Sequence, residues 1–250
     1  MEIGWLTAYV DMPASVYDAG TQFWQAATGS EVSEPLGESG EYAILRPSVG
    51  DAHLIVQRIG DDVSRIHLDL HVESLREAAE RAVELGARVL VERSWLVMES
   101  PGGLVFCFVS YNGESVRAAP HPDPPHRLDQ ISIDCPSELF ESECRFWSEL
   151  TGWNSTASAL DEFVRLMTPD ALPYRILLQR LGEGDGGTSV RAHLDIACGD
   201  NIDEVAAEHE RLGAVKVGRR KYWVTMRDPA GLPYCLTPRD PFTGAVAQVG

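Results

Sequence analysis

The chain has 250 residues, of which 44% are hydrophobic and 24% charged. This composition is typical of globular proteins and excludes disordered, collagen-like and disulfide-stapled chains. Acidic residues outnumber basic ones by 38 to 21, for a formal net charge of −17. That charge repels nucleic-acid phosphates and anionic membrane surfaces, so we expect neither as a partner.

In the first half of the chain, we expect the same order of strands and helix to occur twice. A strand over residues 6–11 precedes a helix starting at Ser15, with Asp18 as its capping partner, and strands are expected near 42–45 and 54–57. The second round begins with a strand over 66–72 and a helix between Ser74 and Gly86. Strands near residues 89, 96–98 and 104–109 close it. The pattern predicts two strand–helix–three-strand modules and therefore an α+β fold.

The second half of the chain repeats the first. Phe23-Trp24 recurs as Phe146-Trp147, 123 positions later, and Arg65-x-His67-Leu68-Asp69 recurs as Arg191-x-His193-Leu194-Asp195 after 126. Pro101-x-Gly103-Leu104-x-x-Cys107 recurs as Pro229-x-Gly231-Leu232-x-x-Cys235 after 128, although Ser100 stands where the second copy has Asp228. The conserved order with small shifts indicates duplication with short loop insertions.

We therefore expect two domains, 1–112 and 126–240, joined by a proline-rich linker over 113–125. The first residues carry no export signal, and no apolar run is long enough to span a membrane, so the cytoplasm is expected. Five cysteines without CxxC spacing are expected to be reduced. The glycine-rich stretch from Gly182 to Gly187 lacks the lysine of a phosphate-binding loop and is expected to be a flexible loop.

These repeated motifs, with Asp134-Cys135-Pro136 and Leu177-Leu178-Gln179-Arg180, resemble the glyoxalase-like branch of the vicinal oxygen chelate superfamily. That superfamily includes bleomycin-resistance and dioxygenase proteins. The resemblance implies a tandem fold in which paired βαβββ modules form two eight-stranded cups. The helices would lie outside each cup, and a ligand or metal ion would lie inside it.

Strand alternation supplies the candidate site residues, because every second side chain of a strand shares a face. The catalytic candidates are the repeated His-x-Asp pairs, His67 with Asp69 and His193 with Asp195. The ligand-binding candidates lie on the same expected faces or in the strand before the Pro-x-Gly turn: Thr7, Tyr9, His71, Trp95, Cys107, Gln130, Ser132, Trp223 and Cys235. A solvated strand face, a structural His–Asp pair or plain packing of the tryptophans would give the same patterns.

The resemblance also implies metal ligands on the first, fifth and eighth strands. Carried over by motif, these are Thr7, His67 and Cys107 in the first copy, and Gln130, His193 and Cys235 in the second. The glutamate of metal-dependent relatives is replaced by cysteine in both copies. We therefore expect no metal cofactor. If a metal ion is present, Gln130, His193 and Cys235 would hold Zn(II).

The leading hypothesis is metal-independent binding of a small organic metabolite or antibiotic in a cup, by a monomer or homodimer. One alternative is a divalent-metal-dependent lyase, isomerase or dioxygenase with its site in the second cup. Another is a metal-free acid–base enzyme that uses His193 or His67. Whether the protein is an enzyme stays open at this point.

Overall fold

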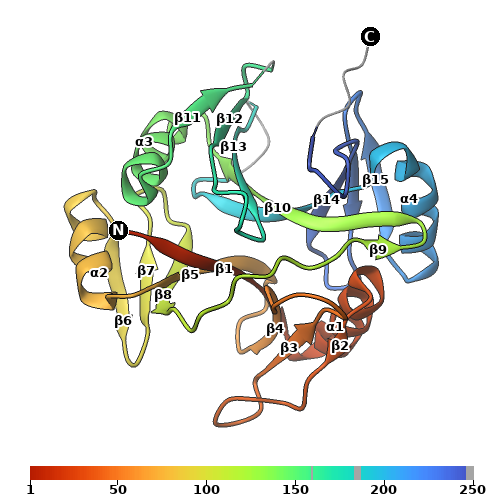
Figure 1. Cartoon of the computed structure of the whole chain (residues 1–250), viewed down its shortest axis with the longest axis horizontal. Helices are drawn as coiled ribbons and strands as arrows, with labels where there is room; N and C mark the ends of the chain where they lie inside the picture. The colour runs from red at the N-terminus through yellow and green to blue at the C-terminus, as the bar shows by residue number, and fades with distance from the viewer. Residues whose placement is uncertain (159, 183–186, 246–250) are drawn as a thin grey trace. The chain divides into compact units, whose positions relative to one another are not determined.

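The computed structural model of the chain describes residues 1–158, 160–182 and 187–245. Residues 183–186 of the expected glycine-rich loop lie outside the described residues. Within the described residues, the strand–helix–three-strand order occurs four times, twice in each repeat (Figure 1). The predicted α+β fold class and the predicted modules are thus confirmed.

The first repeat contains two modules. The first module comprises β1 (Ile3–Pro13), α1 (Ala14–Thr28), β2 (Glu31–Val32), β3 (Tyr42–Arg46) and β4 (Leu54–Ile59). The second comprises β5 (Arg65–Val72), α2 (Leu75–Glu84), β6 (Arg88–Glu92), β7 (Leu96–Glu99) and β8 (Val105–Ser110). The Ser74 side chain caps α2 by accepting a hydrogen bond from the Glu77 backbone N–H. The expected Ser15 cap does not form, because α1 begins directly after Pro13.

The second repeat follows the same plan. Its first module comprises β10 (Pro125–Cys135), α3 (Phe140–Thr151), β11 (Ser155–Ala157), β12 (Phe163–Leu166) and β13 (Arg175–Arg180). Its second comprises β14 (Arg191–Ala197), the 3-10 turn η1 (Gly199–Asn201), α4 (Ile202–Arg211), β15 (Val215–Arg219), β16 (Val224–Arg227) and β17 (Pro233–Thr237). The short strand β9 (His121–Pro122) lies in the segment expected to be a linker and pairs with β10.

Each repeat supplies the strands of one sheet. The first sheet has eight strands in the order β2-β3-β4-β1-β5-β8-β7-β6, and the second has β11-β12-β13-β10-β14-β17-β16-β15 with β9 added. Each sheet contains a parallel pair, β5 with β8 and β14 with β17. These two parallel pairs carry most of the candidate site residues.

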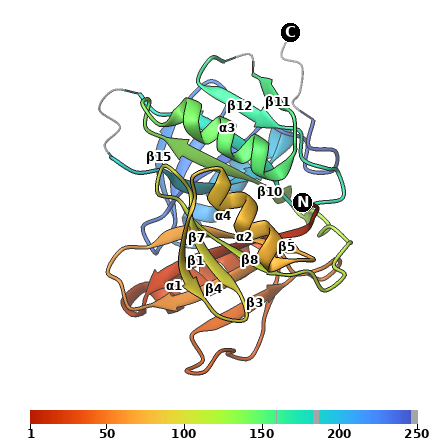
Figure 2. The same cartoon turned by 90° about the vertical axis from the view of Figure 1, so that its left-hand side faces the viewer.

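By contacts, the chain divides into two compact units that each take half of both repeats. The first unit comprises Met1–Ala8, His67–Val116 and Ile131–Ala192. In this unit α2 packs on β6, β7 and β8, and α3 packs on β13. Figure 2 shows α2 and α3 beside each other, where the Arg81 guanidinium donates to the backbone carbonyl of Glu149. The domain boundaries expected from the repeats stay a prediction.

The second unit comprises Tyr9–Ile66, Arg117–Gln130 and His193–Gly250. In this unit α4 packs on β15, β16 and β17, and α1 packs on β4. Its core contains Phe23 and Trp24 of α1 against Tyr234 of β17, with ring centroids 5.6 and 5.5 Å apart. The aromatic repeat motif therefore forms core, as its helical spacing predicts.

None of the helices within the described residues is long and apolar enough to cross a membrane. All five cysteines lie in the described part of the chain, and none of them forms a disulfide.

Candidate metal centre

The candidate residues of β5 are buried, although they are polar. Leu68 and Leu70 take one face of the strand, and His67 and Asp69 take the other, as the alternation predicts. His67 is 8% exposed and Asp69 is 5% exposed. A solvated strand face therefore does not explain the pattern, because burying imidazole and carboxylate groups costs free energy unless other groups compensate.

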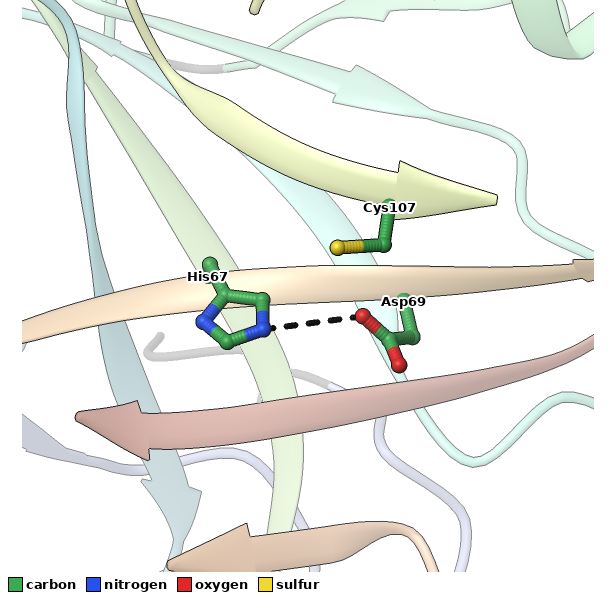
Figure 3. Close-up of side chains that lie close together, drawn as sticks. All are labelled: His67, Asp69 and Cys107. Atoms are coloured by element: carbon green, nitrogen blue, oxygen red, sulfur yellow. Dashed lines mark ion pairs between the residues drawn. The ribbon is translucent and has the colours of Figure 1, made fainter. Parts of the chain in front are cut away.

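His67, Asp69 and Cys107 form the first cluster (Figure 3). Cys107 comes from β8, and the parallel register places it opposite Asp69. His67 Nε2 lies 3.6 Å from Asp69 Oδ1, and one ligand atom from each of the three residues lies within 4.8 Å of the others. Figure 3 shows the Cys107 sulfur on the same side as the ring and the carboxylate, so the three groups converge.

The second cluster consists of His193, Asp195 and Cys235 and has the same construction in the second unit. Asp195 of β14 pairs with Cys235 of β17 in parallel register. His193 Nε2 lies 3.2 Å from Asp195 Oδ1, and the ligand atoms again lie within 4.8 Å of one another. His193 is 7% exposed and Asp195 is 3% exposed. The repeated His-x-Asp motif thus converges with the repeated cysteine in both units.

Opposing effects act on the pKa of the thiol in the second cluster. Burial raises the pKa of Cys235, whereas the charge of His193 and its hydrogen bond to the thiol lower that pKa. A thiol in this setting stays protonated near neutral pH without a further cation. A bound metal ion would displace the proton, because a metal coordinates the thiolate.

Polar side chains surround the second cluster. The Gln130 side-chain amide donates to Asp195 Oδ2, which fixes the carboxylate. Buried Arg239 pairs with buried Asp129, and Arg239 Nη1 lies 3.9 Å from Asp195 Oδ2. Thr225 Oγ1 lies 3.9 Å from Cys235 Sγ. These groups hold Asp195 in place and make this surrounding strongly polar.

The first cluster has different neighbours. Thr7 Oγ1 lies 2.9 Å from His71 Nε2, and Glu114 Oε1 lies 3.8 Å from His71 Nδ1. Burial lowers the pKa of His71, and the negative charge of Glu114 opposes that effect. His71 therefore turns toward Thr7 and Glu114 and is not a member of the cluster.

The remaining candidates are scattered. Ser132 is buried on β10, and Tyr9 lies on β1, where it is only partly exposed. Trp95 is 39% exposed in the turn before β7, where the Arg93 guanidinium lies 5.7 Å from its ring centroid. Trp223 is half-buried in the equivalent turn before β16. Ligand contact by these four residues stays a prediction.

Sequence reasoning missed Arg239, Asp129 and Thr225. None of them belongs to a repeated motif, since the residues at the repeat offsets are Tyr111, Leu6 and Val97. The available signal was this divergence itself. A buried charged residue in one copy with an uncharged counterpart in the other marks a position where the surroundings of the two copies differ.

The chemistry of the donor set fits a divalent cation. Imidazole nitrogen, carboxylate oxygen and thiolate sulfur are the usual zinc ligands, with metal–ligand distances of about 2.0–2.3 Å. Two such ligands in tetrahedral geometry are separated by roughly 3.3–3.6 Å. The observed His–Asp separation of 3.6 Å in the first cluster lies at the upper end of that range, and the 3.2 Å in the second lies just below it.

Comparisons with known proteins agree on the fold. A family model described as glyoxalase-like domain matches residues 7–109 and 130–237. No curated protein matches the chain significantly. Among solved structures, the Mn(II)-bound glyoxalase from Novosphingobium aromaticivorans has a TM-score of 0.67 and 16% identity, covering 97% of this chain and 85% of that one. The 2,2',3-trihydroxybiphenyl 1,2-dioxygenase from Sphingomonas wittichii strain RW1 has a TM-score of 0.64 and 14% identity, over 94% and 89% of the two chains.

The expectation that the protein has no cofactor is wrong. A structure that shares the fold over 97% of this chain has Mn(II) bound, and the described residues form two clusters of side chains that could hold a metal ion. The error has a physical cause, because the family pattern has its carboxylate at the eighth strand, where this chain has Cys107 and Cys235. In this chain Asp69 and Asp195 bring the carboxylate from the neighbouring strand, opposite the cysteine that replaced the glutamate.

Proposed function

Because the chain belongs to the glyoxalase-like domain family, whose model matches most of both repeats, we propose that its second repeat binds a divalent metal ion. His193, Asp195 and Cys235 are the proposed ligands. The residues around the ion would bind a small organic molecule.

One observation carries this proposal: three donors of three chemical types converge within 4.8 Å on two adjacent parallel strands. Burying a carboxylate, an imidazole and a thiol together costs free energy because the groups lose their hydration. A bound cation would compensate for that cost. Three protein ligands are the number found in catalytic zinc sites, which keep a further position for water or substrate, whereas structural zinc sites have four.

The donor set favours Zn(II) over the Mn(II) found in the glyoxalase neighbour. Thiolate is a soft ligand, whereas Mn(II) prefers carboxylate, carbonyl and water oxygens. When bound, Zn(II) supplies a Lewis acid that polarises an oxygen of the substrate, and it has no redox chemistry. The site therefore favours a lyase or isomerase over a dioxygenase.

The surrounding residues have defined tasks in this proposal. Gln130 donates to Asp195 Oδ2 and so directs the other carboxylate oxygen toward His193. Arg239, itself paired with Asp129, offsets part of the negative charge that Asp195 and a Cys235 thiolate would place together. Such supporting contacts fix ligand orientation and tune the metal. The cytoplasmic location and the monomeric or homodimeric state stay predictions from the sequence.

Cobalt substitution tests this function. The protein would be purified without a histidine tag or chelator, loaded with Co(II), and titrated with acetohydroxamate as a small bidentate oxygen probe. We expect a thiolate-to-cobalt charge-transfer band that is reduced in Cys235→Ser, and ligand-field bands that change as the probe binds the open position. A band in Cys235→Ser as strong as in the parent protein would overturn the ligand assignment. A spectrum unaffected by the probe would assign the ion a structural role instead.

A further inference from the structure

We infer that His67, Asp69 and Cys107 bind a second divalent metal ion, so that each chain holds two ions at separate sites. The inference rests on the same donor chemistry as the proposed function. It concerns different residues in the other compact unit, so it succeeds or fails by itself. The expected ligand class is a soft divalent cation such as Zn(II).

The register of the strands builds this site. β5 and β8 are parallel, with Asp69 paired to Cys107, and His67 lies two residues before Asp69 on the same face. In a strand, residues two apart are separated by about 6.6 Å along the backbone. Side chains that lean toward each other can close that distance, and His67 Nε2 does lie 3.6 Å from Asp69 Oδ1. The cysteine then approaches from the adjacent strand as the third donor.

The convergence argues for a cation rather than for a nucleophilic triad. In a cysteine–histidine–carboxylate triad, the histidine bonds the carboxylate through one ring nitrogen and the nucleophile through the other. In Figure 3 the carboxylate and the sulfur both lie on the side of the ring that carries Nε2. Three donors gathered around one point match the requirement of an ion.

The residues around the first cluster differ from those around the second. We therefore expect the first ion to have no part in the chemistry proposed for the second cluster. Cys107 pairs across the sheet with Val97, where Cys235 pairs with Thr225. At the repeat offset, the position of Arg239 is held by Tyr111. Asp129 likewise corresponds to Leu6, which is buried. The first site therefore has the ligands of the second without its charged supporting residues.

Metal stoichiometry tests the inference. Elemental analysis and Co(II) absorption would be measured on the full chain and on Cys107→Ser, Cys235→Ser and the double variant. We expect two ions in the parent chain, one in each single variant and none in the double variant. Cys144→Ser is the matched control, because Cys144 lies on α3 outside both clusters, and it should retain two ions.

The outcomes separate this inference from the proposed function. One ion in the parent chain that persists in Cys107→Ser and is lost in Cys235→Ser would overturn the first site and leave the second. One ion that is lost only in Cys107→Ser would support the first site and overturn the proposed function. If Cys107→Ser does not fold by circular dichroism, Asp69→Asn provides the same test, and retention of both ions by that folded variant would overturn the inference.

Discussion

The two clusters have the same three types of donor but differ at three neighbouring positions. His67, Asp69 and Cys107 match His193, Asp195 and Cys235 one for one, in the same strand register. At the repeat offsets Thr7 corresponds to Gln130, Val97 to Thr225 and Tyr111 to Arg239. The difference teaches that duplication preserved the groups able to hold an ion and let the groups that support them diverge.

The two units also differ in the carboxylate that accepts the hydrogen bond of a buried tryptophan. In the first unit, Trp147 Nε1 donates to Glu143 Oε2 at 2.8 Å, and the backbone N–H of Gly102 donates to Glu143 Oε1 at 2.7 Å. In the second unit, Trp24 Nε1 donates to Asp228 Oδ2 at 2.8 Å, and the Leu232 N–H donates to Asp228 Oδ1 at 2.8 Å. Each buried indole has a carboxylate, supplied by helix α3 in one unit and by the turn after β16 in the other.

The positions of these carboxylates are exchanged between the repeats. Glu143 corresponds to Gly20, and Asp228 corresponds to Ser100. A Cβ atom at Gly20 would lie 2.2 Å from Met12 Sδ, so any side chain there would require Met12 to move. Burial raises the pKa of both carboxyl groups, that of Asp228 to about 6. The replacement of Asp228 by Ser100 is thus compensated by a residue from the other repeat.

The largest effect is expected from breaking the buried ion pair of the second unit. Arg239→Met should destabilise the fold by about 3–5 kcal/mol, because Asp129 would remain buried without its cation. Adding Asp129→Leu, the residue at the first-repeat position, should recover most of that loss, since an apolar pair often replaces a buried ion pair without penalty. Urea unfolding of both variants measures this.

The exposed pair between Arg219 and Asp203 provides the matched control. Arg219→Met should cost less than about 1 kcal/mol, because exposed ion pairs contribute little. If the double variant of the buried pair were as unstable as Arg239→Met alone, the polar pair would be needed for packing itself. The contrast between the two clusters would then be structural and not functional.

Much of the fold followed from the sequence, because the aromatic helix motifs and the alternating strands are local patterns. The His-x-Asp spacing placed His67 with Asp69 and His193 with Asp195 on shared strand faces. The approach of Cys107 to Asp69 depends on the register between β5 and β8, which no local pattern encodes. The division into two units that each combine parts of both repeats could not be predicted either. Glu143 contacts Gly102 of the other repeat, and it belongs to no repeated motif.

A smaller effect should follow from removing the carboxylate of the first unit. Glu143→Ala leaves the Trp147 and Gly102 N–H groups without this acceptor and should destabilise the fold by about 2–4 kcal/mol. Adding Ser100→Asp should recover part of the loss, because it restores a carboxylate where the second unit has Asp228. Exposed Glu149→Ala, on the same helix, is the control and should change little. Chemical denaturation checks all three, and no recovery by Ser100→Asp would refute the exchange.

The smallest effect concerns the pH dependence of stability. It arises from a histidine of helix α4 that has no counterpart in helix α2. Buried His209 occupies the place of Ala82, contacts Phe23 and His126, and lies with Nδ1 2.9 Å from the Tyr234 hydroxyl. Burial, with the charges of His126 and His121, lowers the pKa of His209 from 6.5 to about 3. The folded state therefore favours the neutral ring, so this contribution to stability is complete above pH 6.5 and is lost as the pH falls toward 3.

Between pH 7 and pH 5, His209→Gln should lose about 2 kcal/mol less stability than the parent protein. Urea unfolding at the two pH values measures the difference, and Tyr234→Phe, which keeps the imidazole, should retain the parent's pH dependence. Equal losses in His209→Gln and the parent protein would show that this histidine does not titrate on unfolding.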